Sequence, residues 1–349
     1  MSQVLIALSG GVDSAAAASL LLEQGHACAG AHLRLFEGAR EAGDAEAAAQ
    51  RLGMPFHLFD MRERFGREVM ARFAESYLRG ETPNPCVFCN KGIKFAALLE
   101  KADELGYNAI ATGHYARIEF SNNRWLLKKA MDDTKDQSYV LYTLAQDQLA
   151  RVKFPLGAMT KAQVREYAEA RGFLNAQKKE SQDICFVPDG DYGAFLEAYT
   201  GRALRPGDFV DPAGRVLGRH RGTPRYTLGQ RKGLGLALPQ PGYVCGIDPL
   251  RNTVTVGEEA LLFGRTLHAG GINLTACDAL TAPLRCKAKI RYRQAEQWAT
   301  AEQLDSQTLR VTFDDPQRAI TPGQSVVLYD GEYVLGGGTI LNGTDTAPC

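Results

Sequence analysis

The sequence predicts an α/β fold: a doubly wound parallel sheet first, then a small, mostly β central domain, and finally a C-terminal β-barrel. Three observations lead to this prediction. Short apolar runs alternate with helical patterns from residues 4–8 onward, which is the order of a parallel sheet covered by helices. A glycine turn, Ser9-Gly10-Gly11, follows the first run. Past residue 201 the chain changes to short β-like runs broken by Gly and Pro.

Length and composition set the outer limits. The chain has 349 residues, enough for roughly two to three domains, and we place their boundaries at 1–200, 201–262 and 263–349. Its 40 basic and 40 acidic residues cancel, so any nucleic-acid binding must come from local patches. No apolar run approaches a membrane span, and the N-terminus lacks the pattern of a signal peptide. We expect a cytoplasmic monomer that binds no membrane.

The first strand, turn and helix indicate a phosphate site. Residues 4–8 are all apolar, and residues 15–24 form an Ala- and Leu-rich helical pattern that ends at Gly25. Glycines let backbone N–H groups approach a ligand, and the start of a helix favours an anion. An ordinary tight turn is the alternative. A Walker A loop requires a Lys before its Ser or Thr and a dinucleotide site requires Gly-x-Gly-x-x-Gly, and neither is present.

The residues of this turn, Ser9-Gly10-Gly11-Val12-Asp13-Ser14, resemble the PP-loop of the ATP pyrophosphatases. Members of that family grip the pyrophosphate of ATP and release it while they form an adenylated intermediate. The resemblance therefore implies ATP as a cofactor and a PP-loop fold of the adenine nucleotide α hydrolase type.

The other elements of the first domain follow from periodicity and turn signals. Further strands are expected at 28–35, 56–59 and 108–112, a hairpin at 117–128, and helices at 44–52, 62–78, 90–105 and 160–172, with an apolar helical stretch after Tyr139. In the long helix 62–78, one face carries Phe65, Val69, Phe73 and Tyr77, each four residues from the last. That spacing predicts a buried face.

Three of the cysteines stand apart from the rest. Eight cysteines, at positions 28, 86, 89, 185, 245, 277, 286 and 349, are too few for a disulfide scaffold in a chain of this length. Cys86 and Cys89 form a C-x-x-C in a loop stiffened by Pro83 and Pro85. Cys89 is expected near a helix N-terminus, where the helix dipole favours the thiolate. We therefore predict a reactive sulfur there, and periodicity does not reveal whether Cys185 is close.

Two segments of the β-rich part are strongly basic. Residues 215–246 contain six Arg or Lys and no acid, and residues 285–293 alternate strictly between cations and other residues. On a strand, that alternation places five cations on one face and Cys286, Ala288, Ile290 and Tyr292 on the other. We favour RNA contact for 285–293, and leave RNA contact and a solvated face equally open for 215–232. Strands at 309–313, 325–329 and 333–335, with turns at 314–316 and 330–331, complete the expected barrel.

Together the motifs resemble one family, the tRNA-specific 2-thiouridylases, which replace O2 of the wobble uridine with sulfur. The likeness covers essentially the whole chain. It rests on SGGVDS, TPNP-x-x-x-C-N-K-x-I-K-F, ATGHYAR, KDQSYVLYTL, SQDICF around Cys185, YTLGQRKGLG, RYRQ and TPGQS, all in family order. It implies a sulfurtransferase whose partners are a tRNA with a wobble uridine and a sulfur donor, either a sulfur-relay protein, a cysteine desulfurase or sulfide.

The resemblance also implies roles for individual residues. It places Cys89 as the nucleophile and Cys185 as the persulfide carrier, with Asp13 beside a Mg²⁺-bound pyrophosphate. The residues implied for ATP are Ala7, Leu8, Ser9, Gly10, Gly11, Val12, Asp13, Ser14, Leu33 and Gly113. Those implied for the target base are Asn84, Pro85 and Cys86, and those for the rest of the tRNA are His114, Lys135, Asp136, Gln137, Arg291, Tyr292 and Gln324.

Two features depart from the family pattern. Many members carry Asp where this chain has Cys86, and residues 36–43 look shorter than the corresponding acidic loop. Cys86, Cys89 and Cys185 make three possible thiolate ligands, the number that would hold a [4Fe-4S] cluster with one open iron. A zinc site needs a fourth ligand, for which His114 is a candidate. Because a third soft ligand has no evident purpose in a two-cysteine mechanism, the sequence favours the cluster over the persulfide route.

Two other functions compete with this one. A different PP-loop reaction, such as amide synthesis or citrulline adenylation, needs neither cysteines in the site nor a basic barrel. A tRNA-binding protein that has lost catalysis would not need an intact SGGVDS motif together with Cys89 and Cys185.

Overall fold

The computed structural model describes residues 2–39, 42–173 and 184–343. In the first part of the chain, five strands form a parallel sheet in the order β3-β2-β1-β4-β7. They are β1 (Gln3–Ala7), β2 (Ala27–Arg34), β3 (Phe56–Asp60), β4 (Ala109–Ala111) and β7 (Val152–Lys153). Val4, Leu5 and Ile6 of the central strand are fully buried, as in a strand covered on both faces. The predicted doubly wound sheet is confirmed.

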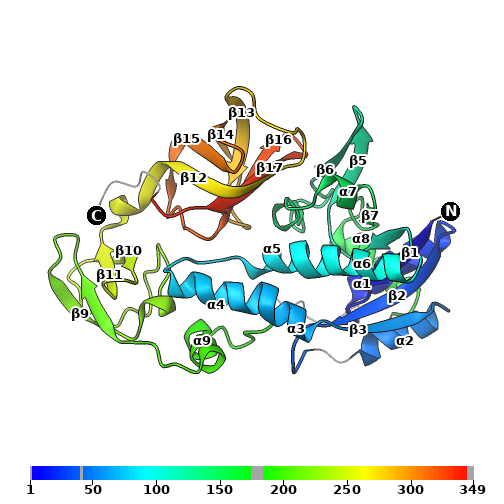
Figure 1. Ribbon diagram of the computed structural model, residues 1–349, viewed down its shortest axis with the longest axis horizontal. Coiled ribbons are helices and arrows are strands. Elements are labelled where there is room, and N and C mark those ends of the chain that lie inside the picture. Colours follow the sequence, from blue (N-terminus) through cyan, green and yellow to red (C-terminus); the bar gives the residue numbers. More distant parts are fainter. Residues whose placement is uncertain (1, 40–41, 174–183, 344–349) are drawn as a thin grey trace.

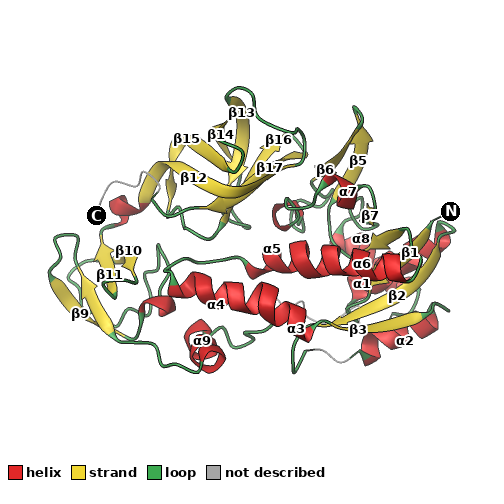
Figure 2. Ribbon diagram, viewed as in Figure 1, coloured by secondary structure: helices red, strands yellow, loops and turns green. Residues whose placement is uncertain are grey.

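Figure 2 shows the helices gathered around this sheet and in the middle of the molecule. They are α1 (Val12–Glu23), α2 (Gly43–Arg51), α3 (Arg62–Phe65), α4 (Ala71–Leu78), α5 (Pro85–Cys89), α6 (Leu98–Glu104), α7 (Gln146–Leu149), α8 (Lys161–Ala170) and α9 (Tyr192–Thr200). The π-helical turns η1 (Gly66–Met70) and η2 (Asn90–Ala97) join α3 to α4 and α5 to α6, so each pair forms one long helix. Phe65, Val69, Phe73 and Tyr77 are buried, as their spacing predicted.

The C-terminal strands form a closed barrel. They are β12 (Phe263–Leu274), β13 (Leu284–Lys289), β14 (Gln297–Gln303), β15 (Thr308–Arg318), β16 (Ser325–Asp330) and β17 (Tyr333–Ile340). They pair in the order β12-β15-β14-β13-β16-β17, and β12 also pairs with β17. Closure removes the free edges that an open sheet would expose.

A hairpin from the first part of the chain extends this barrel sheet. Its strands are β5 (Arg117–Ser121) and β6 (Arg124–Lys128), and Lys128 pairs with Tyr333 of β17. Asn122 and Asn123 both have positive φ, 50° and 58°, as a tight hairpin turn requires. The nucleotide-type fold and the barrel thus share one hydrogen-bonded sheet (Figure 1).

A third sheet, β10-β11-β8-β9, lies at the end of the molecule opposite the parallel sheet (Figure 1). Its strands are β8 (Gly207–Val210), β9 (Val216–His220), β10 (Tyr243–Asp248) and β11 (Thr253–Gly257). Phe209, Val244 and Val254 are fully buried in its core. The β-rich central region is therefore confirmed, while the boundaries 1–200, 201–262 and 263–349 stay a prediction.

Three local predictions are wrong. After Tyr139 the chain forms only a 3-10 turn, η3 (Ser138–Val140), because Tyr139 is drawn under the barrel, where its hydroxyl donates to the Ser325 carbonyl at 2.7 Å. Residues 314–316 are not a turn: β15 continues to Arg318, and an irregularity in its pairing with β12 absorbs them. Helix α9 was not expected at all.

Residues 178–183 of the SQDICF region lie outside the described residues. Within the described ranges, no helix combines the length and the apolar character needed to cross a membrane.

Candidate active site

The phosphate turn between β1 and α1 is held by two serines. Ser14 Oγ donates to the Gly11 carbonyl at 2.9 Å, and the Ser9 N–H donates to Ser14 Oγ at 3.1 Å. Gly10 has φ +72°, and a Cβ there would lie 2.7 Å from Cβ of Asp44, so only glycine fits. The turn therefore presents backbone N–H groups at the start of a 12-residue helix, an arrangement that suits an anion.

The residues implied for ATP cluster at the carboxyl ends of neighbouring strands. Ala7 ends β1, Leu33 is near the end of β2, and Gly113 follows β4. A Cβ on Gly113 would lie 3.0 Å from the backbone of Asp13 and Ser14, so the loop after β4 touches the first turn of α1. The structure brings these predicted residues together, at the place in a doubly wound sheet where ligands bind.

Asp13 has partners that the sequence did not predict. Its carboxylate accepts two hydrogen bonds from Lys161 Nζ, at 2.7 and 2.8 Å, and one from the Tyr115 hydroxyl at 2.8 Å. Lys161 is the first residue of α8, and its side chain is 8% exposed. The capping box Thr160-x-x-Gln163 located this helix start correctly, but nothing in the sequence places it beside Asp13.

The thiol loop differs from the prediction in one important respect. Asn84 is the N-cap of a helix that begins at Pro85, and its side chain accepts the N–H of Cys86 at 3.1 Å. The helix therefore starts about one turn before Cys89 rather than at it. Cys89 is 7% exposed and packs in an apolar cluster with Phe186 and other residues.

Burial has the largest effect on the pKa values of Cys89 and Cys185. It raises the pKa of Cys89 to about 12, a rise that Lys94 opposes and that Cys185 and Cys86 reinforce. Burial likewise raises the pKa of Cys185, again with a contribution from Cys86. The predicted thiolate-favouring position of Cys89 is wrong, because apolar packing outweighs the helix dipole. Cys86 and Cys89 share α5, and Ile184 and Phe186, on either side of Cys185, pack in the same cluster as Cys89, so the three cysteines lie in one neighbourhood, which the sequence could not show.

A cleft of about 1340 Å³ collects all the residues predicted for the target base and the rest of the tRNA, together with Asp13. It is lined by Asp13, Asn84, Pro85, Cys86, His114, Lys135, Asp136, Gln137, Arg291, Tyr292 and Gln324. Cys89 and Cys185 do not line it, although Ile184 does. Asn90 and Lys94, which follow Cys89 on the same helix, line it too and were not singled out from the sequence. Residues from the phosphate turn, the thiol loop and the barrel thus face one cavity.

The predicted tRNA residues of the first domain are partly used to build the cleft wall. Gln137 accepts the N–H of Tyr115 through its side chain and donates to the Tyr115 carbonyl through its backbone, both at 2.9 Å. Asp136 accepts from Ser138 Oγ at 2.7 Å. His114 is buried, and burial, with Lys94 second, holds its pKa well below its usual range. His114 is therefore a neutral part of the wall.

The predicted barrel residues also make internal bonds. Arg291 donates to the carbonyl of Ala319 at 2.8 Å and to Thr321 Oγ1 at 3.1 Å, and burial lowers its pKa. Gln324 donates to the carbonyl of Thr82 at 2.6 Å. The Gln324 bond docks the barrel on the thiol loop, whereas both Arg291 bonds lie within the barrel region. Whether the same residues also touch tRNA stays a prediction.

The alternation in the basic segment 285–293 holds only in part. Cys286 and Ile290 are buried as expected, but Tyr292 is 38% exposed. Its predicted place on the buried face is wrong because β13 ends at Lys289. The chain then turns, with the Ile290 N–H donating to Gln294 Oε1 at 3.3 Å.

The cations of the basic segments have acidic neighbours. Arg285 pairs with Asp314 and lies against Trp298, 4.9 Å from its ring centre. Lys289 lies 3.8 Å from Glu296. In the central region the pairs are Arg215 with Asp211, Arg219 with Asp208, and Arg225 with Asp191 and Glu197. Because Arg285 and Lys289 have acidic partners, the self-repulsion within 285–293 is smaller than the sequence suggested, and RNA contact there stays a prediction.

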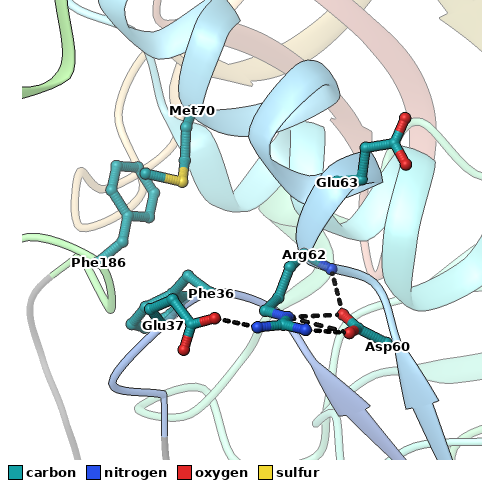
Figure 3. A pocket seen from close by; sticks show the side chains of 7 residues that line it. All are labelled: Phe36, Glu37, Asp60, Arg62, Glu63, Met70 and Phe186. Carbon is teal, nitrogen blue, oxygen red and sulfur yellow. Dashed lines mark hydrogen bonds and ion pairs between the residues drawn. The ribbon is translucent and has the colours of Figure 1, made fainter.

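A second hollow, of about 690 Å³, lies beside Phe186, next to Cys185. Figure 3 shows Glu37 and Asp60 turned toward Arg62, which pairs with both, while Met70 faces Phe186. Among the described residues, the lining of this hollow contains no cysteine and no residue of the phosphate turn, whereas the larger cleft is lined by Cys86 and Asp13.

The metal prediction rested on Cys86, Cys89 and Cys185. Among the described residues, no three His, Cys, Asp or Glu are arranged as a group that could hold a metal ion. Cys89 is buried, whereas Cys86 and Cys185 are exposed. The three thiols are neighbours, but as placed here they do not fit a cluster.

Comparison with known proteins agrees with this architecture. Residues 2–189 match the family model of the tRNA methyl transferase HUP domain, residues 193–258 its PRC-barrel domain, and residues 265–340 the aminomethyltransferase beta-barrel domain. A crystal structure of a 4-thiouridine synthetase–RNA complex with bound ATP covers 57% of this chain and 50% of its own, at 18% identity and a TM-score of 0.40.

Relatives that match over nearly the full length of the chain identify its family. The tRNA-specific 2-thiouridylase MnmA of Carboxydothermus hydrogenoformans is 47% identical over 97% of both chains. The protein of the same name from Acetivibrio thermocellus is 45% identical over 97% of this chain and 99% of its own. The chain belongs to the family of tRNA-specific 2-thiouridylases.

Proposed function

We propose that this protein replaces O2 of the wobble uridine of tRNA with sulfur, using ATP. The observation that carries the proposal is the single cleft that Asp13, Cys86 and Arg291 line together. A nucleotide phosphate, a sulfur centre and an RNA strand would meet there, and holding reactants together supplies much of a rate enhancement.

The first step is adenylation. Uridine O2 bonds to the α-phosphorus of ATP, pyrophosphate leaves, and the uracil ring gives up its N3 proton. Backbone N–H groups in the first turn of α1 would hold phosphate oxygens, which the glycines of the turn allow to come close. We include Mg²⁺, which would neutralise charge on the pyrophosphate; it commonly takes one or two carboxylates together with substrate phosphates, and Asp13 is the carboxylate at the turn.

The second step transfers sulfur. The terminal sulfur of a Cys185 persulfide bonds to C2 as AMP leaves. Cys89 then attacks the Cys185 sulfur, which breaks the bond to the transferred sulfur; the ring takes back a proton and a Cys89–Cys185 disulfide forms. A thiol reductant must reopen it. Cys185 is exposed, as a persulfide carrier that must meet a sulfur donor should be. Cys89 is buried, which suits a residue that reacts only with Cys185.

A [4Fe-4S] cluster held by Cys86, Cys89 and Cys185 is the alternative source of sulfur. The closeness of the three thiols supports it, and their present arrangement does not. Cys86→Ser separates the two: under the persulfide route the variant keeps much of its activity, whereas loss of a cluster ligand removes both iron and activity. Iron and sulfide analysis after anaerobic purification is the measurement, and an iron-free protein that still thiolates tRNA rules the cluster out.

The partners follow from the chemistry. They are a tRNA with a wobble uridine and a sulfur donor. A sulfur-relay protein or a cysteine desulfurase would pass persulfide sulfur to Cys185, whereas sulfide would form the Cys185 persulfide by attacking the Cys89–Cys185 disulfide and releasing the Cys89 thiolate. We also propose that the protein acts as a monomer in the cytoplasm.

Mass spectrometry of tRNA nucleosides tests the function. The protein is incubated with unmodified tRNA, ATP, Mg²⁺ and a sulfur donor, either a persulfide-transferring protein or sulfide, and 2-thiouridine is expected at the wobble position only when ATP is present. Cys89→Ser and Cys185→Ser should give none under the persulfide route with a protein donor. An unmodified tRNA with ATP consumed would point instead to another PP-loop reaction.

A further inference from the structure

The phosphate turn has no cation of its own. No Lys or Arg occurs in residues 1–33, which contain β1, the turn, α1 and most of β2. Backbone N–H groups and the helix dipole offer only partial charges, whereas ATP brings several full negative charges to this point. Other phosphate turns answer this need with a lysine inside the motif. Here a cation must come from elsewhere in the fold.

The fold delivers one from a position 148 residues away. Lys161 Nζ lies 2.7 and 2.8 Å from the two carboxylate oxygens of Asp13, in the first turn of α1. Two contacts fix the start of α8, the helix that carries Lys161. The Lys161 N–H donates to Asp132 at 2.9 Å, and Thr160 is the N-cap. The ammonium also lies 5.7 Å from the centre of the Tyr115 ring.

A lysine buried this deeply needs a reason. Its side chain is 8% exposed, and burial of a charge is costly unless the charge is paired. The pairing with Asp13 meets that need in the nucleotide-free state. The Asp13 side chain is 29% exposed and lines the cleft. The ion pair therefore lies at the boundary between the interior and the space beside the turn.

We propose that Lys161 is the phosphate-site lysine of this enzyme: its Nζ contacts the pyrophosphate part of ATP, and Asp13 holds it in place until the nucleotide binds. The inference rests on the proposed use of ATP and adds to it the residue that neutralises the departing pyrophosphate. It makes Lys161 a catalytic residue, since it would touch the substrate, rather than only the counter-ion of Asp13.

Binding of inorganic pyrophosphate in EDTA tests the proposal, because without metal Asp13 can only repel the anion. The variants are Lys161→Met, the double variant Asp13→Asn with Lys161→Met, and Arg165→Met as the control. The double variant has the wild-type net charge and leaves no unpaired buried charge, so it guards against a folding defect, which unfolding curves check. Arg165 is exposed one turn further along α8.

Both Lys161 variants should bind pyrophosphate at least about 10-fold more weakly than the wild type, the size of a lost hydrogen bond between charged groups. Arg165→Met should bind as the wild type does. A double variant that binds pyrophosphate within about twofold of the wild type overturns the inference and leaves ATP use intact. A wild-type protein that binds neither pyrophosphate nor ATP overturns both the inference and the proposed function.

Discussion

Gln324 of the barrel donates its side-chain amide to the carbonyl of Thr82, 2.6 Å away, two residues before the N-cap of the thiol helix. The Thr82 N–H in turn donates to the Pro322 carbonyl at 2.9 Å. The barrel therefore fixes the position from which Asn84 and Cys86 face the cleft. Gln324, which the family resemblance assigns to tRNA, therefore has a structural role in positioning the thiol loop.

Gln324→Met should destabilise the protein by about 1–2 kcal/mol, because the Thr82 carbonyl loses its partner in a partly buried place. Thiolation should slow while tRNA affinity changes little. Urea unfolding and filter binding measure the two effects, with the exposed Gln307→Met as control. A variant that loses tRNA affinity at unchanged stability would return Gln324 to a purely RNA-binding role.

Gly323→Ala should act on the same contact through the backbone. Gly323 has φ +87°, and a Cβ there would lie 3.0 Å from Cβ of Glu81 and 3.1 Å from N of Thr82. Strain at positive φ costs about 1–2 kcal/mol, and the contact adds to it. The midpoint of thermal unfolding should fall, whereas Gly331→Ala, also at positive φ but with nothing nearby, should show the strain alone. Equal losses in the two variants would mean that the Gly323 contact relaxes freely.

Asp13→Ala should abolish pyrophosphate release during thiolation. The turn loses its only predicted metal-facing carboxylate, and Lys161 keeps a buried charge without this partner. Because Asp13 is partly exposed, we expect a loss of stability of up to about 3 kcal/mol. A coupled phosphate assay and urea unfolding measure both. Wild-type turnover by this variant would remove the basis for a PP-loop mechanism.

Arg293→Ala should reduce the salt dependence of tRNA binding. Arg293 lines the cleft, whereas Arg285 is outside its lining, where it pairs with Asp314 and contacts Trp298. Each phosphate contact contributes roughly 0.7–0.9 to the slope of log affinity against log salt. The slope should therefore flatten by nearly one unit for Arg293→Ala and stay unchanged for Arg285→Ala. Slopes unchanged in both variants would mean that the basic segment is solvated and does not contact RNA phosphates.

Stability should fall at alkaline pH through Cys286. Burial raises the pKa of this thiol to about 11, above the roughly 8.5 of an unfolded chain. A group whose folded pKa is raised contributes stability that is complete below the unfolded value and is lost as the pH rises toward the folded one. Between about pH 8.5 and 11, the wild type should therefore lose more free energy of unfolding than Cys286→Ala. Parallel pH profiles from urea unfolding would contradict this.

Local pattern was enough to predict much of the fold. Phe65, Val69 and Phe73 are buried because a four-residue spacing puts them on one helix face, and Asn122-Asn123 forms its hairpin because both residues tolerate positive φ. These features depend on neighbours in the chain, so they can be read from it.

The parts that failed depend on residues far apart. Cys89 was expected at the start of a helix, but the helix begins at Pro85, and Phe186, 97 positions further along the chain, packs in the same apolar cluster as Cys89. Lys161 meets Asp13 across 148 positions, and no periodicity encodes that meeting. The prediction for Tyr292 failed because β13 ends at Lys289, three residues before it. There the Gln294 side chain, and not a neighbouring strand, accepts the Ile290 N–H.

The pairing of Lys128 with Tyr333 has a consequence for how the enzyme is made. The ribosome releases β5 and β6 some two hundred positions before β17, and until then that hairpin has an open edge, the kind of surface at which chains associate wrongly. The barrel residues of the cleft wall, from Lys289 to Gln324, are also missing for most of this interval. A nascent chain can therefore complete its nucleotide-binding sheet, but it cannot assemble a working site on tRNA until synthesis has reached the final strand.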